Sequence, residues 1–410
     1  MLALTTALRV WLALRQMRHV TAHRDAVPAE FADRIPLADH QKAADYTTAK
    51  LQLGMVELAV DVALLLAFTF GGLLAAFDAF WRGILADTGF YGLALFASVG
   101  VTGFVVGLPF SLYRTFNLEA RFGFNKMTPG LYVADLVKQL ILTVLIGAPL
   151  LLLVLWLMGA MGEQWWLYVW MTWLAFNLLV LLLYPTFIAP LFNKFAPLAE
   201  GEVKARIEAL LARCGFASSG LFVMDGSKRS AHGNAYFTGF GRSKRIVFFD
   251  TLIDKLAPGE VEAVLAHELG HYKRRHIVKR IVVMSALSLA LLWLLGQLID
   301  QSWFYEGLKV GSGSTAMALI LFSLVLPVFT FPFGPLMSWH SRKHEFEADA
   351  YAAQQADGGE LVAALVKLYR DNAATLTPDP LHSLFYDSHP PASERIAHLK
   401  SQPRQEPVPC

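Results

Sequence analysis

Residues 267–271 read His-Glu-Leu-Gly-His within a stretch that favours a helix. Residues four apart lie on one helical face, so the imidazoles of His267 and His271 can converge on a single metal ion. Glu268 lies about 100° further round the axis, where it can reach a metal-bound water. This is the spacing of zinc-dependent hydrolases, in which the glutamate is a general base and not a ligand. The sequence therefore predicts a hydrolytic Zn²⁺ site.

A third protein ligand is required, because catalytic zinc takes three and leaves one position for water. His276 does not supply it through the longer HExxHxxGxxH motif. That motif would need Gly at 274 and His at 277, where the chain has Arg274 and Ile277. We therefore expect His276 to be an exposed helix histidine.

A second stretch, HEFEADAYAA at 344–353, is a better source of the third ligand. Glu345 and Asp349 are four residues apart and share one face of the predicted helix. One carboxylate can bind the metal while the other hydrogen-bonds a ligating histidine and orients it. Composition alone leaves Glu347 open as the ligand, and an ordinary solvated acidic face is the plainer alternative.

The elements that carry these residues belong to a very apolar chain. Of its 410 residues 55% are hydrophobic and 17% charged, against about 25% charged in a typical soluble domain. Six apolar stretches are long enough to cross a bilayer, and a shorter seventh begins at the first Met. They are 55–80, 91–112, 139–160, 165–188, 281–300 and 314–337, with the seventh at 1–16. We predict a mainly α, polytopic membrane protein with about seven transmembrane helices.

Charge and cysteine usage limit the possible partners. The net charge is only +2 and no lysine-rich or arginine-rich block is present, which argues against a nucleic-acid partner. The two cysteines, Cys214 and Cys410, are far apart and build no disulfide framework. We expect the polar regions to face a reducing compartment.

Lysine and arginine in the short polar segments set the orientation, because these residues stay on the cytoplasmic side. Segments 17–54 and 113–138 are rich in them, whereas 161–164 has none and 301–313 has only Lys309. Seven spans with an outside N-terminus then place the zinc site in the cytoplasm. The predicted parts are N-terminal membrane helices at 1–188, a first zinc-domain segment at 189–280, a membrane hairpin at 281–337 and a second zinc-domain segment at 338–410.

The first zinc-domain segment also carries strand signals. An amphipathic helix at about 200–214 precedes two β-branched and aromatic runs at 220–225 and 244–250, which predict a small β-sheet. A helix then begins at Pro258, a residue suited to a first helical turn. The two zinc-domain segments must fold together across the hairpin.

Several segments resemble the type I CAAX prenyl endopeptidase family, the integral-membrane zinc peptidases that act on prenylated protein C-termini. They follow the family's order over nearly the whole chain. The segments are LPFSLYRTFNLEARFGFNKMT (108–128), IAPLFNKFAPL (188–198), DGSKRSAHGNAYFTGFGRSKRIVFFDTLI (225–253), AVLAHELGHYKRRH (263–276), SRKHEFEADAYA (341–352) and SHPPASERI (388–396).

The resemblance implies a role for each matching residue, in a gluzincin-like zinc domain. Glu345 is favoured over Glu347 as ligand, because the family's ligand precedes Phe in its Glu-Phe-x-Ala-Asp run. His389 matches the group that contacts the scissile carbonyl oxygen. The full implied set is His267, His271 and Glu345 as ligands of one Zn²⁺, Glu268 as base, His389 at the oxyanion, Asn234, Ala235 and Tyr236 along the substrate, and Asp349 with Arg395 as support.

The resemblance also implies membrane helices that enclose a chamber, which Glu57 and Asp61 would line, since charge facing lipid is costly. The short connection from Asp250 to Pro258 is typical of a bacterial member, and hence of an inner-membrane protein.

The predicted partners are the lipid bilayer and a peptide or protein substrate, which a prenylated C-terminus would supply. Two alternatives stay open. One is a general quality-control protease of membrane proteins with no prenyl requirement. The other is a non-catalytic transporter or scaffold with a structural metal, against which the intact Glu268 argues.

Overall fold

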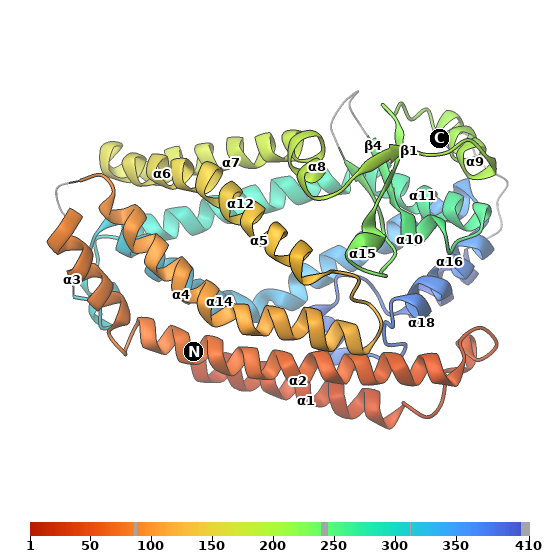
Figure 1. Ribbon diagram of the computed structural model, residues 1–410, viewed down its shortest axis with the longest axis horizontal. Helices are drawn as coiled ribbons and strands as arrows, with labels where there is room; N and C mark the ends of the chain where they lie inside the picture. Colours follow the sequence, from red (N-terminus) through yellow and green to blue (C-terminus); the bar gives the residue numbers. More distant parts are fainter. Residues whose placement is uncertain (86–87, 239–244, 312, 403–410) are drawn as a thin grey trace.

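The long helices run roughly along the long axis of the molecule, and the β-sheet lies at one end (Figure 1). The computed structural model describes residues 1–85, 88–238, 245–311 and 313–402. Cys410 and residues 239–244 of the strand-rich region lie outside that range. Within it, six helices are long and apolar enough to cross a membrane, which confirms a mainly helical, multi-pass membrane protein. They are Leu37–Phe68, Tyr91–Glu119, Pro129–Ala160, Gly162–Phe192, His276–Leu298 and Thr315–Gln355.

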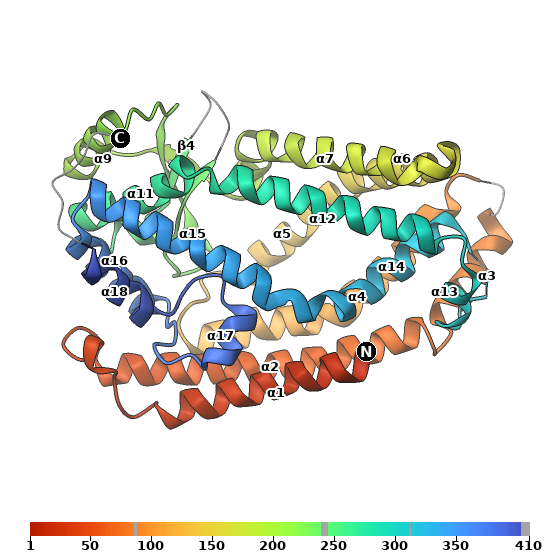
Figure 2. The same ribbon diagram turned by 180° about the vertical axis from the view of Figure 1, so that it is seen from behind.

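The expected seventh span at 1–16 is part of α1 (Leu2–Ala22), which is not among those six. It carries Arg9, Arg15 and Arg18. The helix packs along α2 (Leu37–Phe68), as both ribbon views show (Figures 1 and 2). A short 3₁₀ turn, η1 (Ala29–Phe31), lies in the connection between them.

The predicted bounds of the span at 55–80 are wrong, because the chain there forms two helices. Helix α2 begins well before the apolar stretch and ends at Phe68, and α3 runs from Leu73 to Leu85. Gly72 between them has φ 75°, which a right-handed helix does not accommodate. Apolar residues continue on both sides of this break, so hydrophobicity alone does not reveal it.

Three later spans contain π-helical segments, and in two of them a proline lies inside the segment or just beyond it. Helix α5 (Pro129–Leu142) continues through η3 (Thr143–Gly147) into α6 (Ala148–Ala160), and Pro149 follows the π segment. Proline removes a helical hydrogen bond, and local π geometry accommodates that loss within an unbroken helix. Pro185 lies inside another π segment, η5, in the span Gly162–Phe192. The remaining helices of this region are α4 (Tyr91–Tyr113), η2 (Arg114–Glu119), η4 (Gly162–Gln164), α7 (Trp165–Leu183), η5 (Tyr184–Ile188) and α8 (Ala189–Phe192).

The predicted small sheet has four strands in the order β1-β2-β4-β3. The two predicted strands are β2 (Leu221–Met224) and β4 (Arg245–Phe249), which pair in parallel. The unpredicted β1 (Phe195–Pro197) pairs antiparallel with β2, and β3 (Ala235–Thr238) pairs antiparallel with β4. Strands β1 and β3 are therefore the two edges of the described sheet.

Helix α11 (Pro258–Lys273) begins at Pro258 as predicted and forms the centre of the polar end. It packs against α9 (Glu202–Arg213), α15 (Gly334–Gln355) and α16 (Gly358–Asp371). The two zinc-domain segments thus fold together across the hairpin. The other elements are η6 (Gly226–Lys228), α10 (Asp250–Ile253), α12 (His276–Leu298), α13 (Ser302–Glu306), α14 (Thr315–Thr330), η7 (Phe331–Phe333), α17 (Pro380–Tyr386) and α18 (Ala392–Ser401).

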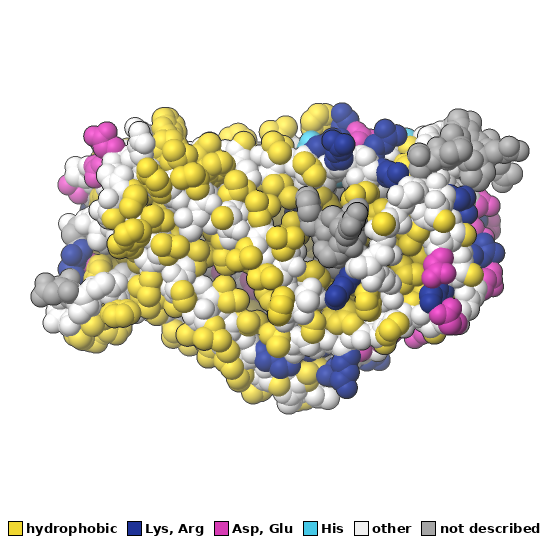
Figure 3. Space-filling model, turned by 90° about the horizontal axis from the view of Figure 1, so that it is seen from above, with side chains coloured by type: hydrophobic (Ala, Val, Ile, Leu, Met, Phe, Trp, Pro, Cys, Tyr) yellow, Lys and Arg dark blue, Asp and Glu magenta, His cyan; other side chains and the backbone are white. Residues whose placement is uncertain are grey.

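The surface divides in the same way as the fold. Hydrophobic side chains cover much of the face over the long helices, while most charged side chains gather toward the end that carries the sheet (Figure 3). Leu145 and Trp156 of this helical part are 67% and 59% exposed. Such broad exposure of large apolar side chains suits contact with lipid.

The two acidic residues expected to line a chamber have different surroundings. Arg114 donates to Glu57 at 2.6 Å, which gives this carboxylate a cationic partner. Asp61 lines a cavity of about 360 Å³ between α1, α2 and α14, together with Arg9. That they face water in a chamber stays a prediction.

Candidate active site

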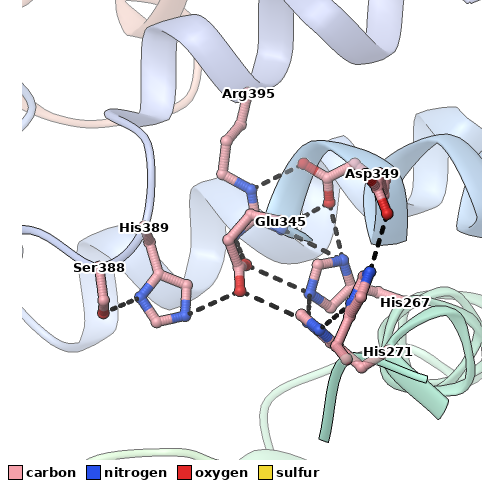
Figure 4. A network of polar contacts seen from close by, with 9 residues as sticks. His267, His271, Glu345, Asp349, Ser388, His389 and Arg395 are labelled. Atoms are coloured by element: carbon pink, nitrogen blue, oxygen red, sulfur yellow. Dashed lines mark hydrogen bonds and ion pairs between the residues drawn. The ribbon is translucent and has the colours of Figure 1, made fainter. Parts of the chain in front are cut away.

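Two helices that touch closely form the site. A Cβ atom at Gly270 of α11 would lie 2.9 Å from the Cα of Ala348 in α15, so only glycine permits this approach. The contact places His267 and His271 of α11 opposite Glu345 and Asp349 of α15 (Figure 4). Four of the predicted site residues are thereby brought together.

Three residues bring their possible ligand atoms close together. The Nε2 atoms of His267 and His271 are 3.2 Å apart. Oε2 of Glu345 lies 3.5 Å from Nε2 of His267, and its Oε1 lies 3.4 Å from Nε2 of His271. The three residues form the one group among the described residues whose ligand atoms are placed to hold a metal ion.

The spacing fits a tetrahedral ion of the size of zinc. Donor atoms about 2.0–2.2 Å from such an ion lie about 3.3–3.6 Å from one another. The Oε2 atom of Glu345 is buried and has no hydrogen-bond partner among the described residues. A buried carboxylate oxygen without a donor is costly, and a bound cation would satisfy it.

His267 is oriented by the residues predicted to support the site. Its Nδ1 lies 2.8 Å from Oδ1 of Asp349, so Nδ1–H donates and Nε2 is left for the metal. Arg395 of α18 donates to both oxygens of the same carboxylate, at 2.8 and 2.6 Å. Both partners are buried, which makes Asp349 and Arg395 a fixed unit behind His267.

The electrostatics of the site favour a cation. Burial alone would lower the pKa of His267, but the nearby carboxylates of Asp349 and Glu345 raise that pKa to about 9. Burial and the neighbouring His267 lower the pKa of His271 to about 4. Burial raises the pKa of Glu268, as suits a carboxylate that must take up a proton. Metal binding displaces protons from ligating histidines, so an ion replaces the charge on His267.

His389 reaches the site from the loop before α18. Its Nε2 lies 3.6 Å from Oε1 of Glu345, and its Nδ1 lies 3.0 Å from Oγ of Ser388 (Figure 4). The side chain is 61% exposed, so its ring is free to meet a bound molecule. The hydroxyl of Tyr369 donates to the carbonyl of Pro390 at 3.4 Å and ties this loop to α16.

The three predicted substrate-binding residues lie at and just before the edge strand. Asn234 accepts a backbone hydrogen bond from Phe249 of β4 at 2.9 Å. Antiparallel strands alternate their hydrogen-bonding sides, so Tyr236 faces β4 and the backbone of Ala235 faces the open edge. Strand β3 also contacts α11, the helix that carries His267 and His271.

The expectation that His276 is exposed is wrong. Its side chain is only 4% exposed and its Nδ1 lies 3.0 Å from Nδ1 of His271. Its Nε2 lies 3.0 Å from Glu347, so the competing glutamate is paired with His276 and is not in the three-residue group. In one continuous helix, positions five apart differ by about 140° in direction. Arg275, with φ 56°, lies between α11 and α12 and turns the chain, so that the ring of His276 points toward His271.

Two family models match nearly the whole chain. The family model described as CAAX prenyl protease N-terminal, five membrane helices, matches residues 16–194, and the model of peptidase family M48 matches residues 197–402. A CAAX prenyl protease 1 homolog of Dictyostelium discoideum is 36% identical over 386 residues, which cover 91% of this chain and 89% of that protein. CAAX prenyl protease 1 of Saccharomyces cerevisiae is 38% identical and covers 72% of this chain and 69% of its own length.

A solved structure agrees with the fold. The crystal structure of S. mikatae Ste24p superposes with a TM-score of 0.90 at 33% identity and covers 97% of this chain and 96% of that one. M48 proteins are metallopeptidases, so a catalytic metal and a hydrolytic activity follow from the family. The chain belongs to the CAAX prenyl protease branch of peptidase family M48, the integral-membrane metallopeptidases.

Proposed function

We propose that this chain is a zinc endopeptidase that cleaves prenylated peptides close to their C-terminus. The observation that carries the proposal is the convergence of His267, His271 and Glu345 at tetrahedral spacing, with a buried oxygen of Glu345 left without a donor. These residues would hold the Zn²⁺. The relatives' names supply the substrate class, because they are CAAX prenyl proteases.

Bound zinc would supply Lewis-acid chemistry, which acidifies water and polarises a peptide carbonyl. The protein's own residues do the rest. Glu268 takes the proton from the attacking water and delivers it to the leaving amine. His389 donates a hydrogen bond to the oxygen on which negative charge develops. Asp349 and Arg395 keep His267 in the tautomer that exposes Nε2.

The substrate backbone would add to the sheet along β3. Asn234, Ala235 and Tyr236 would hold it, since an edge strand offers unpaired backbone donors and acceptors to an extended peptide. The prenyl group would lie among the membrane helices, in a chamber that they enclose. Prenyl chains are apolar, and their removal from water stabilises such a complex.

We also propose that the chain lies in a bacterial inner membrane and that its metal centre is on the cytoplasmic side. Lys273, Arg274 and Arg275 lie exposed where α11 meets the membrane helix α12. Positive charge at such a boundary is retained on the cytoplasmic side. A protease site accessible only from outside sealed, right-side-out vesicles would contradict this orientation.

The deciding experiment measures cleavage of matched farnesylated and unlipidated C-terminal peptides by detergent-purified protein, with bound zinc assayed in the same preparation. Glu268→Gln is the control. Cleavage of the farnesylated peptide alone supports the proposal. Equal cleavage of both peptides means a general quality-control protease instead. Bound zinc without cleavage of either peptide would favour a scaffold with a structural metal.

A further inference from the structure

The two histidines of the metal centre are supported in different ways. His267 has a carboxylate, Asp349, directly on its Nδ1 at 2.8 Å. His271 has no carboxylate there; its Nδ1 instead lies 3.0 Å from Nδ1 of a second imidazole, that of His276. The other nitrogen of His276 lies 3.0 Å from Oε2 of Glu347. His271 is therefore also linked to a carboxylate, that of Glu347, but through the ring of His276.

These contacts assign the protons. The carboxylate of Glu347 only accepts, so His276 donates to it from Nε2. Neutral His276 then has a lone pair on Nδ1, which accepts the Nδ1–H of His271. His271 is thereby held in the tautomer whose Nε2 is unprotonated. This Nε2 is the atom that lies beside Nε2 of His267 and the carboxylate of Glu345.

The surroundings keep this chain of contacts in place. His276 is buried at the start of α12, directly after the left-handed Arg275. The ring of His344 stacks on it, with centroids 3.9 Å apart and an interplanar angle of 11°. Lys279 lies 3.7 Å from Glu347 and favours its charged form. His276 and Glu347 come from α12 and α15, so the support bridges both sides of the membrane hairpin.

We propose that His276 and Glu347 are positioning residues for His271, which act by fixing the tautomer and ring orientation of that ligand. The inference rests on the proposed zinc site and adds two residues to it. Neither residue touches the substrate or the metal in this arrangement. Partners of ligating histidines of this kind typically change metal affinity by about 10–100-fold when they are removed.

The test compares two substitutions of His276 that have similar shapes but differ in the chemistry of their δ atoms. The Oδ1 of asparagine occupies roughly the place of histidine Nδ1 and can still accept from His271, whereas leucine offers no acceptor. The readout is zinc release from full-length, detergent-purified protein to a competing chelator. We expect His276→Leu to release zinc about 10–100-fold more readily. His276→Asn should retain most of the affinity.

His40→Leu is a matched control, because it makes the same change at another buried histidine, 1% exposed and hydrogen-bonded to the carbonyl of His23. It should leave zinc release unchanged. Co²⁺-substituted protein gives a second readout, since a change of ligand orientation alters the visible spectrum in His276→Leu but not in His40→Leu. A purely structural role for His276 would not separate asparagine from leucine.

Glu347→Ala keeps the proposal testable if His276→Leu does not fold, because Glu347 is partly exposed at 31%. We expect it to release zinc more readily than the unaltered chain, though less so than His276→Leu. Wild-type zinc release by Glu347→Ala, or equal release by His276→Asn and His276→Leu, would overturn the proposal. Absence of zinc from the unaltered chain is a different result, since it overturns the proposed function itself.

Discussion

The Oδ1 of Asp349 lies 2.8 Å from the Nδ1 of His267, although a membrane hairpin separates their two helices in the sequence. The same oxygen accepts from Arg395 at 2.6 Å. A candidate ligand, the carboxylate on its Nδ1 and the guanidinium that pairs with this carboxylate thus form one buried group. This group joins α11, α15 and α18.

Asp349→Asn tests this group. The amide keeps the size of the side chain but loses the charge, and it leaves buried Arg395 with only the more distant carboxylate of Glu345, at 3.9 Å. We expect a fall of about 10–100-fold in zinc affinity, measured by chelator competition. Thermal stability should fall as well, since an uncompensated buried charge costs about 3–5 kcal/mol. Unchanged zinc affinity would show that Asp349 does not orient His267.

Gly270→Ala tests the close approach of the two helices. The added Cβ meets the Cα and carbonyl oxygen of Ala348 at 2.9 and 3.0 Å, so α15 must move away. Overpacking of this kind typically costs about 1–3 kcal/mol of stability. Zinc affinity should fall along with it, because Glu345 moves with α15. Gly259→Ala is a suitable control, since its nearest neighbour is the flexible side chain of Glu360.

Glu268→Gln separates metal binding from catalysis. The substitution removes the base without removing a ligand, so zinc content should stay at the level of the unaltered chain. Hydrolysis should fall by about 10²–10⁴-fold, the usual contribution of a positioned acid or base. Zinc content and peptide cleavage should be measured on one preparation. Loss of zinc in this variant would contradict the role of Glu268 as base.

Glu345→Ala and Glu347→Ala distinguish the two candidate glutamates. Glu345 lies within the three-residue group, whereas Glu347 contacts His276 and Lys279 instead. We expect Glu345→Ala to lose stoichiometric zinc and Glu347→Ala to retain it with reduced affinity. Metal analysis after dialysis measures the difference. The reverse order would move the ligand to Glu347.

Ala235→Pro tests peptide binding along the edge strand. The backbone N–H of Ala235 faces away from β4 and donates to Oδ1 of Asn234 at 2.8 Å, an acceptor that a bound peptide would have to replace. Proline is tolerated in an edge strand where its missing donor faces outward. The substitution should raise KM for peptides by about 5–10-fold, the worth of one hydrogen bond, and leave kcat nearly unchanged. Ala235→Val keeps the N–H and serves as control. An effect on kcat alone would argue against a binding role.

The sequence predicted which side chains converge better than it predicted their surroundings. The spacing of His267 and His271 is local and survives in any helix, so their convergence was predictable. The choice of Glu345 depended on a family resemblance, because helical spacing treats neighbouring glutamates alike. The burial of His276 was not predictable, since it depends on the left-handed conformation of Arg275.

The membrane part shows the same limit. Hydrophobic stretches located the six spans, but they did not show where the helices end. The polar residues that precede position 55 continue α2, and the apolar residues near Gly72 interrupt it. Strand β1 has only three residues, Phe195–Pro197, and contains no alternating pattern. Both features depend on tertiary contacts and local backbone geometry.

The division of the candidate ligands between α11 and α15 has a consequence for biosynthesis. A ribosome delivers the two histidines first, then the hairpin of α12 and α14, and only afterwards Glu345 and Arg395. Chains fold from the N-terminus as they are made. The nascent chain therefore holds an incomplete centre until the hairpin has been inserted into the bilayer. All three candidate ligands are therefore present together only after the hairpin and the start of α15 have been synthesised.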